Sequence, residues 1–159
     1  MASQPPLQPL SPPDDPAAGS LCVDFDGVIH AFETPFVDPE IISDPPVEGA
    51  LRWLMEMTHH FKVYICSARG ATDERRRADA REAIKRWLAH HWQKAGYRKT
   101  DFGNPIIIVS KKPAAALYVD DRGWRFEGPL DFQRLTPSHI KALAPWNKKP
   151  WDKGDSNHG

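Results

Sequence analysis

Cysteine is scarce in this sequence, and neither charge is in excess. Only 2 cysteines, Cys22 and Cys66, occur among 159 residues, and both lie within apolar runs. This usage indicates a reduced, cytoplasmic protein with buried thiols rather than a disulfide-linked scaffold. The 21 basic residues balance 21 acidic residues. The resulting net charge of zero gives no reason to expect a general nucleic-acid binder or a membrane-surface protein.

Long hydrophobic runs are also missing. No apolar stretch approaches the roughly 18 residues that a membrane-spanning helix needs. The first residues lack a basic region followed by an apolar one, so we expect neither a secretory signal nor a membrane partner. A chain of 159 residues has room for one domain but not for a second core.

Proline is the one residue in clear excess, and the 16 prolines cluster toward the ends of the chain. Residues 1–19 combine many prolines with few bulky apolar side chains, a composition that predicts a disordered arm. Residues 146–159 are rich in Lys, Asp and Gly and are predicted to form a tail, although Trp146 and Trp151 could fold back onto the domain. The folded domain is therefore expected over residues 20–145.

Short apolar runs alternate with helical patterns between these ends. Each run is apolar at consecutive positions and is followed at once by a polar residue, as expected for strands covered on both faces. Strands that alternate with helices predict an α/β fold with a parallel sheet and right-handed crossovers. In such sheets the functional site lies beyond the carboxyl ends of the strands. The runs are 21–23 before Asp24, 63–66 before Ser67, 106–109 before Ser110 and 117–119 before Asp120.

Four segments carry helical signals. The first helix is predicted to begin at residues 44–46, where an Asp cap is followed by two prolines. Thr72 is the predicted N-cap of the second helix, which Gly96 would end. Residues 112–116 have room only for a short helix, and residues 136–138 would cap a last one. The predicted apolar faces are Val47, Leu51, Leu54 and Thr58 in the first helix, and Ala80, Ile84, Trp87, Leu88 and Ala95 in the second.

Carboxylates end two of the predicted strands. In Asp24-Phe25-Asp26, strand alternation places both carboxylates on one side of the chain, with Phe25 pointing away. Asp120 and Asp121 add two more acids at the end of another strand. Carboxylates that converge without His or Cys partners need a hard divalent cation, and oxygen ligands favour Mg²⁺ over Zn²⁺. Either motif alone is better explained as a turn or a solvated strand end, but together they favour a metal site.

A hydroxyl group and two ammonium groups follow the other strands. Ser67 precedes Ala68 and Arg69 at the start of a predicted helix, where a hydroxyl, backbone amides and a guanidinium can bind a phosphate. Lys111 and Lys112 follow another strand, and a lysine there could offset the charge of the carboxylates. Taken singly, the serine is better explained as a helix-start residue and the lysines as a solvated pair. Their shared position at strand ends favours a functional site.

The order of these motifs resembles the haloacid dehalogenase (HAD) superfamily of phosphotransferases. The resemblance covers residues 21–128 and consists of Asp24-x-Asp26-Gly27-Val28, Ser67, Lys112-Pro113 and Asp120-Asp121. Residues 112–128 are similar to small HAD-like hydrolases of bacteria and their phages. The resemblance implies a Rossmannoid three-layer sandwich with a central parallel sheet. It also implies an Mg²⁺-dependent phosphomonoester hydrolase.

The resemblance implies a role for each carboxylate. Asp24 would attack phosphorus and form an aspartyl-phosphate. Asp26, with a raised pKa, would protonate the leaving group and then activate water. Mg²⁺ would be held by Asp24, the main-chain carbonyl of Asp26 and Asp120, with Asp121 acting through water. An acid at position 26 resembles the phosphatases and phosphomutases more than the dehalogenase and ATPase branches.

The phosphate contacts follow from the same resemblance. Ser67, with Ala68 and Arg69 beside it, and Lys112 would neutralise the equatorial phosphoryl oxygens. Lys112 is preferred over Lys111 because the family's lysine commonly precedes a proline. Positioning and charge neutralisation carry most of the catalysis of phosphoryl transfer.

Neither interval between the motifs is long enough for a separate cap domain, so the site would stay open to large or extended substrates. Residues 30–36 would form a small flap, in which Phe32 and Phe36 either stack on a base or sugar or pack internally. Nucleotides and polynucleotide phosphate ends fit an open site, as does a phosphosugar or a phosphoprotein. The alternatives to a phosphatase are a non-catalytic HAD-like binding module and a phosphotransferase to an acceptor other than water.

Arginine makes the second predicted helix strongly basic. The run Arg75-Arg76-Arg77 is followed by Arg81, Lys85 and Arg86, but acidic residues interleave with them. A solvated helix face is therefore favoured over a groove for a polyanion. The 7 histidines show no metal-ligand spacing with cysteine and are assigned to the surface. The sequence leaves the oligomeric state open.

Overall fold

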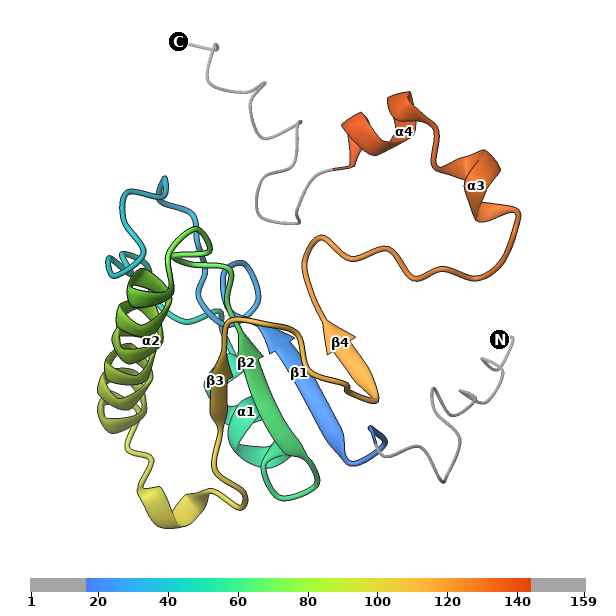
Figure 1. The fold of residues 1–159 in the computed structure, drawn as a ribbon. Coiled ribbons are helices and arrows are strands. Elements are labelled where there is room, and N and C mark those ends of the chain that lie inside the picture. The colour runs from blue at the N-terminus through green and yellow to red at the C-terminus, as the bar shows by residue number, and fades with distance from the viewer. Residues whose placement is uncertain (1–16, 144–159) are drawn as a thin grey trace, which may run out of the picture.

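The computed structural model of the chain describes residues 17–143 (Figure 1). Most of the predicted N-terminal arm and the whole predicted tail, with Trp146 and Trp151, lie outside the described residues. Residues 17–19 form a turn that leads into the first strand. No helix within the described range combines the length and apolarity that a membrane crossing requires.

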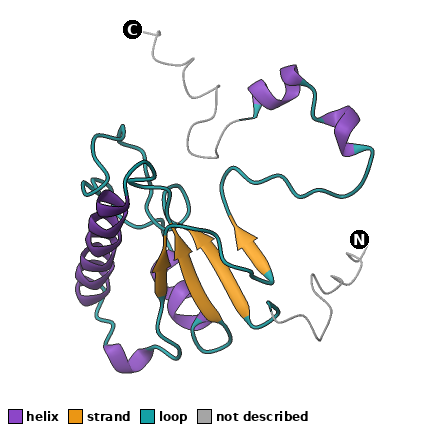
Figure 2. Ribbon diagram, viewed as in Figure 1, coloured by secondary structure: helices purple, strands orange, loops and turns teal. Residues whose placement is uncertain are grey.

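Four parallel strands form one sheet in the order β3-β2-β1-β4 (Figure 2). All four match predicted strands, and the predicted α/β fold with a parallel sheet is confirmed. The carboxyl ends of the strands therefore meet at one edge, as the sequence predicted. The strands are β1 (Ser20–Asp24), β2 (Lys62–Cys66), β3 (Ile107–Val109) and β4 (Leu117–Val119).

One face of the sheet carries the hydrophobic core. Leu21 and Val23 of β1 and Val63 and Ile65 of β2 are buried on this face, in agreement with the pairing of Leu21 with Val63 and of Val23 with Ile65. Both long helices pack against it and join the same cluster of buried side chains. These helices are α1 (Ala50–Met57), which contributes Leu54, and α2 (Glu74–Lys94), which contributes Ile84, Trp87 and Leu88.

The opposite face of the sheet is crossed by an extended segment, residues 110–116, that runs from β3 to β4 (Figure 1). The predicted short helix at 112–116 is wrong. Seven residues must reach from one edge strand to the other, and a helix would advance only about 1.5 Å per residue against about 3.3 Å for an extended chain. Within residues 17–143 no helix covers this face, so the predicted third layer is absent there.

The edge strands are more exposed than the sequence predicted. Leu117 and Tyr118 of β4 are each 44% exposed, and Ile107 of β3 is 36% exposed. A consecutive apolar run predicted cover on both faces, and consecutive residues are buried only in the central strands, at residues 21–23 of β1 and 65–66 of β2. Cover on both faces is therefore confirmed only for the middle of the sheet.

The first helix begins later than predicted. It starts at Ala50, after Gly49, which has φ 81°. The carboxylate of Asp44 does not cap this helix, because it accepts hydrogen bonds from the amide (2.8 Å) and the hydroxyl (2.5 Å) of Thr34. The prediction that residues 44–46 begin the helix is therefore wrong.

The second helix follows its predicted pattern closely. Its N-cap is Asp73, whose carboxylate accepts from the amide of Arg75 at 2.8 Å, so the predicted cap at Thr72 is wrong by one residue. Four of the five predicted face residues are buried, whereas Ala95 is exposed at the C-cap. Gly96 follows with φ 85°, which confirms the predicted end of the helix.

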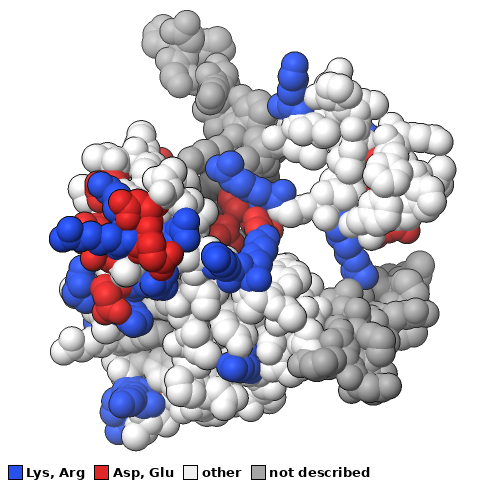
Figure 3. All heavy atoms as spheres, in the orientation of Figure 1, with Lys and Arg blue, Asp and Glu red and all other residues white. Residues whose placement is uncertain are grey.

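The basic residues of α2 are largely paired with acidic ones. Figure 3 shows acidic and basic side chains interleaved over this helix. Arg77 lies 2.9 Å from Glu74, and Lys85 lies 2.6 Å from Glu82. The interpretation of this surface as a solvated, ion-paired helix face is confirmed for these pairs.

The segment after β4 leaves the sheet and ends in two short helices, α3 (Asp131–Arg134) and α4 (Pro137–Ala142), which lie apart from the sheet in Figure 1. The hydroxyl of Thr136 accepts from the amide of His139 at 3.2 Å, which confirms the predicted cap of the last helix. No additional domain interrupts the described residues. The interval from β1 to β2 holds a loop and α1, and that from β2 to β3 holds α2 and the single turn η1 (Lys99–Asp101).

Candidate functional site

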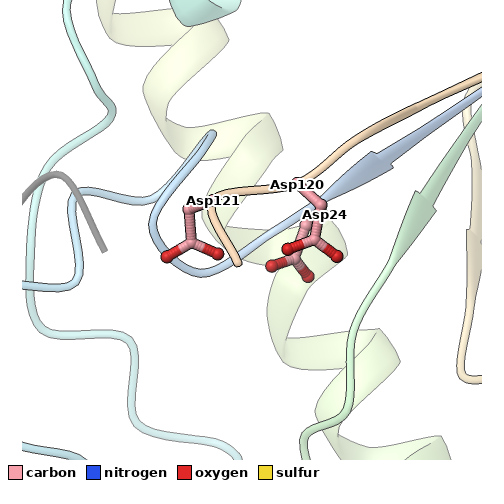
Figure 4. Close-up of side chains that lie close together, drawn as sticks. All are labelled: Asp24, Asp120 and Asp121. Carbon is pink, nitrogen blue, oxygen red and sulfur yellow. The ribbon is translucent and has the colours of Figure 1, made fainter. Parts of the chain in front are cut away.

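Three carboxylates from two neighbouring strands converge at the carboxyl edge of the sheet. Asp24 ends β1, and Asp120 and Asp121 directly follow β4. One carboxylate oxygen of each residue lies within 4.8 Å of the others (Figure 4). The pairing of Val23 with Val119 is the reason, because it brings the next residues of the two strands side by side. The predicted convergence of Asp24 with Asp120 and Asp121 is confirmed.

The charges of the three acids are only partly balanced. Burial, followed by the charges of Asp120 and Asp121, raises the pKa of Asp24 to about 7. Burial also raises the pKa of Asp121. Burial opposes ionisation of Asp120 as well, but hydrogen bonds from the Arg122 amide and from Lys112 outweigh it and hold the pKa of Asp120 below its usual range.

The donor set fits a divalent cation. Oδ1 of Asp121 is buried and has no hydrogen-bond partner within residues 17–143. An unpaired buried carboxylate oxygen is costly unless a proton or a cation satisfies it. Asp24, Asp120 and Asp121 offer oxygen ligands only, so the set suits a hard cation rather than zinc.

Gly27 makes room for this cluster. Its φ is 84°, and a Cβ atom at this position would collide with the carboxylate of Asp121. The turn after β1 therefore passes directly beside Asp121 only because residue 27 has no side chain.

Lys112 is the lysine that reaches the acids. Its Nζ lies 3.0 Å from Oδ2 of Asp120, and this hydrogen bond raises the pKa of Lys112. The ammonium group also lies 5.6 Å from the ring centroid of Tyr118. Lys111 is exposed and forms no ion pair with any described residue. The geometry thus agrees with the preference for Lys112 over Lys111.

Asp26 does not join the three clustered carboxylates. Its side chain accepts from Nε and Nη2 of Arg69, both at 2.9 Å, and lies 2.8 Å from Nδ1 of His30. Burial alone would raise the pKa of Asp26, but the hydrogen bonds from His30 and Arg69 outweigh it and lower the pKa. The prediction of a raised pKa for Asp26 is therefore wrong, because the sequence did not reveal these two partners.

His30 is buried beside the site, at 2% exposure. The amide of Asp44 donates to its Nε2 at 3.0 Å, so Nδ1 is the ring nitrogen that donates to Asp26. The assignment of all histidines to the surface is wrong for this residue. The signal available in the sequence was its spacing of four from Asp26, with the apolar residues Val28 and Ile29 between them.

Arg69 is buried and fully engaged. In addition to Asp26, its Nη1 donates to the main-chain carbonyls of Asp38 (3.4 Å), Pro39 (3.2 Å) and Ile41 (2.9 Å). The guanidinium therefore ties the loop at residues 38–41 to the site. This geometry does not support the predicted contact between the Arg69 side chain and a phosphate.

Ser67 lies at the predicted edge, one residue beyond β2. Its neighbour Cys66 pairs with Asp24 in the sheet, so the serine borders the acidic cluster. Ser67 is buried, and its Oγ accepts from the amide of Arg69 at 3.2 Å. Ala68 is exposed at the same turn. Binding of phosphate by Ser67 and Ala68 stays a prediction.

Comparisons with known proteins do not identify a family or a function for this chain. The chain matches no protein-family model and has no significant match among curated proteins or solved structures.

Proposed function

We propose that this protein is an Mg²⁺-dependent phosphomonoester hydrolase of HAD type, with Asp24 as its nucleophile. The observation that carries the proposal is the convergence of Asp24, Asp120 and Asp121, in which one oxygen of Asp121 is buried without a partner. Lys112 contacts the cluster and Ser67 borders it. These groups came from four separate strand ends of the sequence, in the order that the HAD resemblance implies.

The metal site in this proposal consists of Asp24, Asp120 and Asp121, with the main-chain carbonyl of Asp26 as a further oxygen ligand. Oxygen ligands at a site that also holds phosphate suit Mg²⁺. When bound, Mg²⁺ supplies positive charge that offsets the negative charge of the carboxylates and of the phosphoryl group. It also lowers the pKa of Asp24, because a cation favours the ionised form.

The chemistry of the chain begins with the carboxylate of Asp24. One of its oxygens attacks phosphorus, the bond from phosphorus to the leaving oxygen breaks, and an aspartyl-phosphate forms. Water then attacks the same phosphorus and releases inorganic phosphate and free Asp24. Lys112 and Ser67 hold the phosphoryl oxygens during both steps, and loss of one such contact costs about 3 kcal/mol.

Asp26 serves the second step better than the first. A carboxylate held ionised by Arg69 and His30 is in the protonation state that a general base needs in order to accept a proton from the attacking water, and its lowered pKa makes it a weak base. To protonate a leaving oxygen in the first step, Asp26 must first take up a proton against its lowered pKa.

The decisive experiment compares the wild type with Asp24→Asn in assays of phosphate release with Mg²⁺. We expect a loss of at least about 1000-fold in Asp24→Asn, and the same loss in the wild type with EDTA. Asp79→Asn, on α2 away from the acidic cluster, is the matched control and keeps full activity. Unchanged phosphate release in Asp24→Asn excludes the mechanism.

Two other outcomes identify the alternatives. A wild type that binds Mg²⁺ but turns over no phosphomonoester is a non-catalytic binding module. A wild type that transfers phosphate to an added alcohol or sugar instead of to water is a phosphotransferase, which product analysis detects.

A further inference from the structure

A cavity of about 380 Å³ lies against Asp26, the second carboxylate after β1. It is lined by Asp26, by Phe36 and Pro39 of the loop after β1, by the turn at residues 68–72 and by Arg76 of α2. Asp26 and Ala68 thus belong both to the proposed phosphate site and to this cavity. A group attached to a phosphate bound between them would extend into it.

Two arginines hold the walls of the cavity together. Arg69 donates to the carbonyl oxygens of residues 38–41, and Nη2 of Arg76 lies 2.5 Å from the carboxylate of Asp38. The turn at residues 68–72 packs directly on the backbone of Arg76, because a Cβ atom at Gly70 would lie 2.6 Å from its carbonyl carbon. Loop, turn and helix therefore form one connected wall.

Phe36 presents an exposed aromatic ring to this cavity. It is 52% exposed, and the Arg69 guanidinium carbon lies 5.3 Å from its ring centroid. Phe32 differs, since it is half-buried and packs against His30 with ring centroids 5.9 Å apart. The sequence left both residues open as stacking or packing groups. The structure makes Phe32 a packing residue and leaves Phe36 as the stacking surface.

We propose that this cavity binds the leaving group of the substrate and that this group is a nucleoside, so that the substrate is a nucleoside monophosphate. The inference rests on the proposed phosphatase function. The water that Asp26 activates attacks from the position that the leaving oxygen vacates, so the leaving group lies against Asp26 in the cavity. A nucleobase stacks on Phe36, and its polar edge bonds to the hydroxyl of Thr72 and to Arg76, which a plain hydrocarbon ring cannot do.

The test compares two substrates that differ only in the base, a nucleoside 5′-monophosphate and ribose 5-phosphate. We expect the wild type to have a kcat/KM at least about tenfold higher for the nucleotide, because base stacking on an aromatic side chain is worth about this factor or more. Phe36→Leu removes most of this preference. Phe132→Leu, which alters a 74% exposed phenylalanine on α3, keeps it.

Three results overturn the assignment: equal turnover of the two substrates by the wild type, equal effects of Phe36→Leu and Phe132→Leu, or a higher kcat/KM for phosphotyrosine. Failure of the phosphatase function looks different, because the wild type then hydrolyses neither these esters nor a generic aryl phosphate. Calorimetric titration with the nucleotide then tests the cavity alone. Binding that is weakened in Phe36→Leu supports the nucleoside pocket, and absent or unchanged binding overturns it.

Discussion

The ammonium group of Lys112 lies 3.0 Å from the carboxylate of Asp120, which joins the segment that crosses the sheet to the end of β4. Both lysines are exposed, but Lys111 forms no ion pair with the described residues. The two lysines therefore differ in position although their chemistry is the same. This difference provides a matched pair for mutation.

Lys112→Ala is expected to lower kcat/KM for a phosphomonoester by about a hundredfold, because the variant loses one charged contact to the phosphoryl oxygens. Lys111→Ala should change kcat/KM by less than about threefold. Steady-state assays at saturating Mg²⁺ give both values. A larger loss in Lys111→Ala would reverse the assignment of the lysine.

Mg²⁺ is expected to stabilise the protein more at about pH 8 than at about pH 5.5. The folded chain raises the pKa of Asp24 to about 7, so it holds a proton that the unfolded chain has lost. The contribution of Asp24 to the stability of the metal-free protein is therefore lost as the pH rises toward 7. Mg²⁺ competes with this proton, and its binding strengthens over the same range.

Thermal unfolding with and without Mg²⁺ at the two pH values measures this effect. The increase in Tm on addition of Mg²⁺ should be the larger at the higher pH. Asp24→Asn, which cannot titrate at this position, should show a smaller increase that changes less between the two pH values. Equal increases in the wild type at both pH values contradict a role for Asp24 in cation binding.

Gly27→Ala should weaken Mg²⁺ binding by at least about tenfold, because the new methyl group displaces the carboxylate of Asp121. Gly49→Ala is the matched control. Gly49 has a similar φ of 81° but open space around it, so the two variants share a backbone strain of about 1–2 kcal/mol. Calorimetric titration with Mg²⁺ distinguishes them, and equal affinities in the two variants would show that Asp121 is not a ligand.

Arg69→Met is expected to destabilise the fold by about 3–5 kcal/mol, since it removes a buried guanidinium and leaves the partly buried carboxylate of Asp26 with His30 as its remaining side-chain partner. Arg52→Met, which breaks an exposed pair with Glu56, should cost less than about 1 kcal/mol. Urea unfolding measures both changes in free energy. A loss in Arg69→Met as small as that of the control would mean that solvent replaces the arginine.

The sequence was sufficient to predict the sheet and the acids at its edge. The apolar runs that end in Asp24 and Asp120 are short, bounded and rich in β-branched or aromatic residues, so their type and their ends are local properties. The carboxyl ends of parallel strands share one edge for topological reasons. The contact between the two aspartates also requires β1 and β4 to be neighbours in the sheet, and the sequence pattern did not specify that strand order.

The surroundings of Asp26 could not be predicted in the same way. They depend on the loop after β1, which folds back so that Arg69 reaches three of its carbonyls and Asp44 reaches His30. None of these contacts leaves a periodic pattern in the sequence. The first helix was misplaced for a related reason, since Asp44 resembles a cap locally but bonds to Thr34, ten residues earlier.

The pairing of β1 with β4 is short, and it sets which acids meet. Three residue pairs define it, the last being Val23 with Val119. A slip of β4 by one residue would turn its side chains to opposite faces and put Asp121 where Asp120 stands. A cation bound by aspartates of both strands would oppose that slip. Removal of the metal would therefore loosen β4, an outer strand of the sheet, as well as the site.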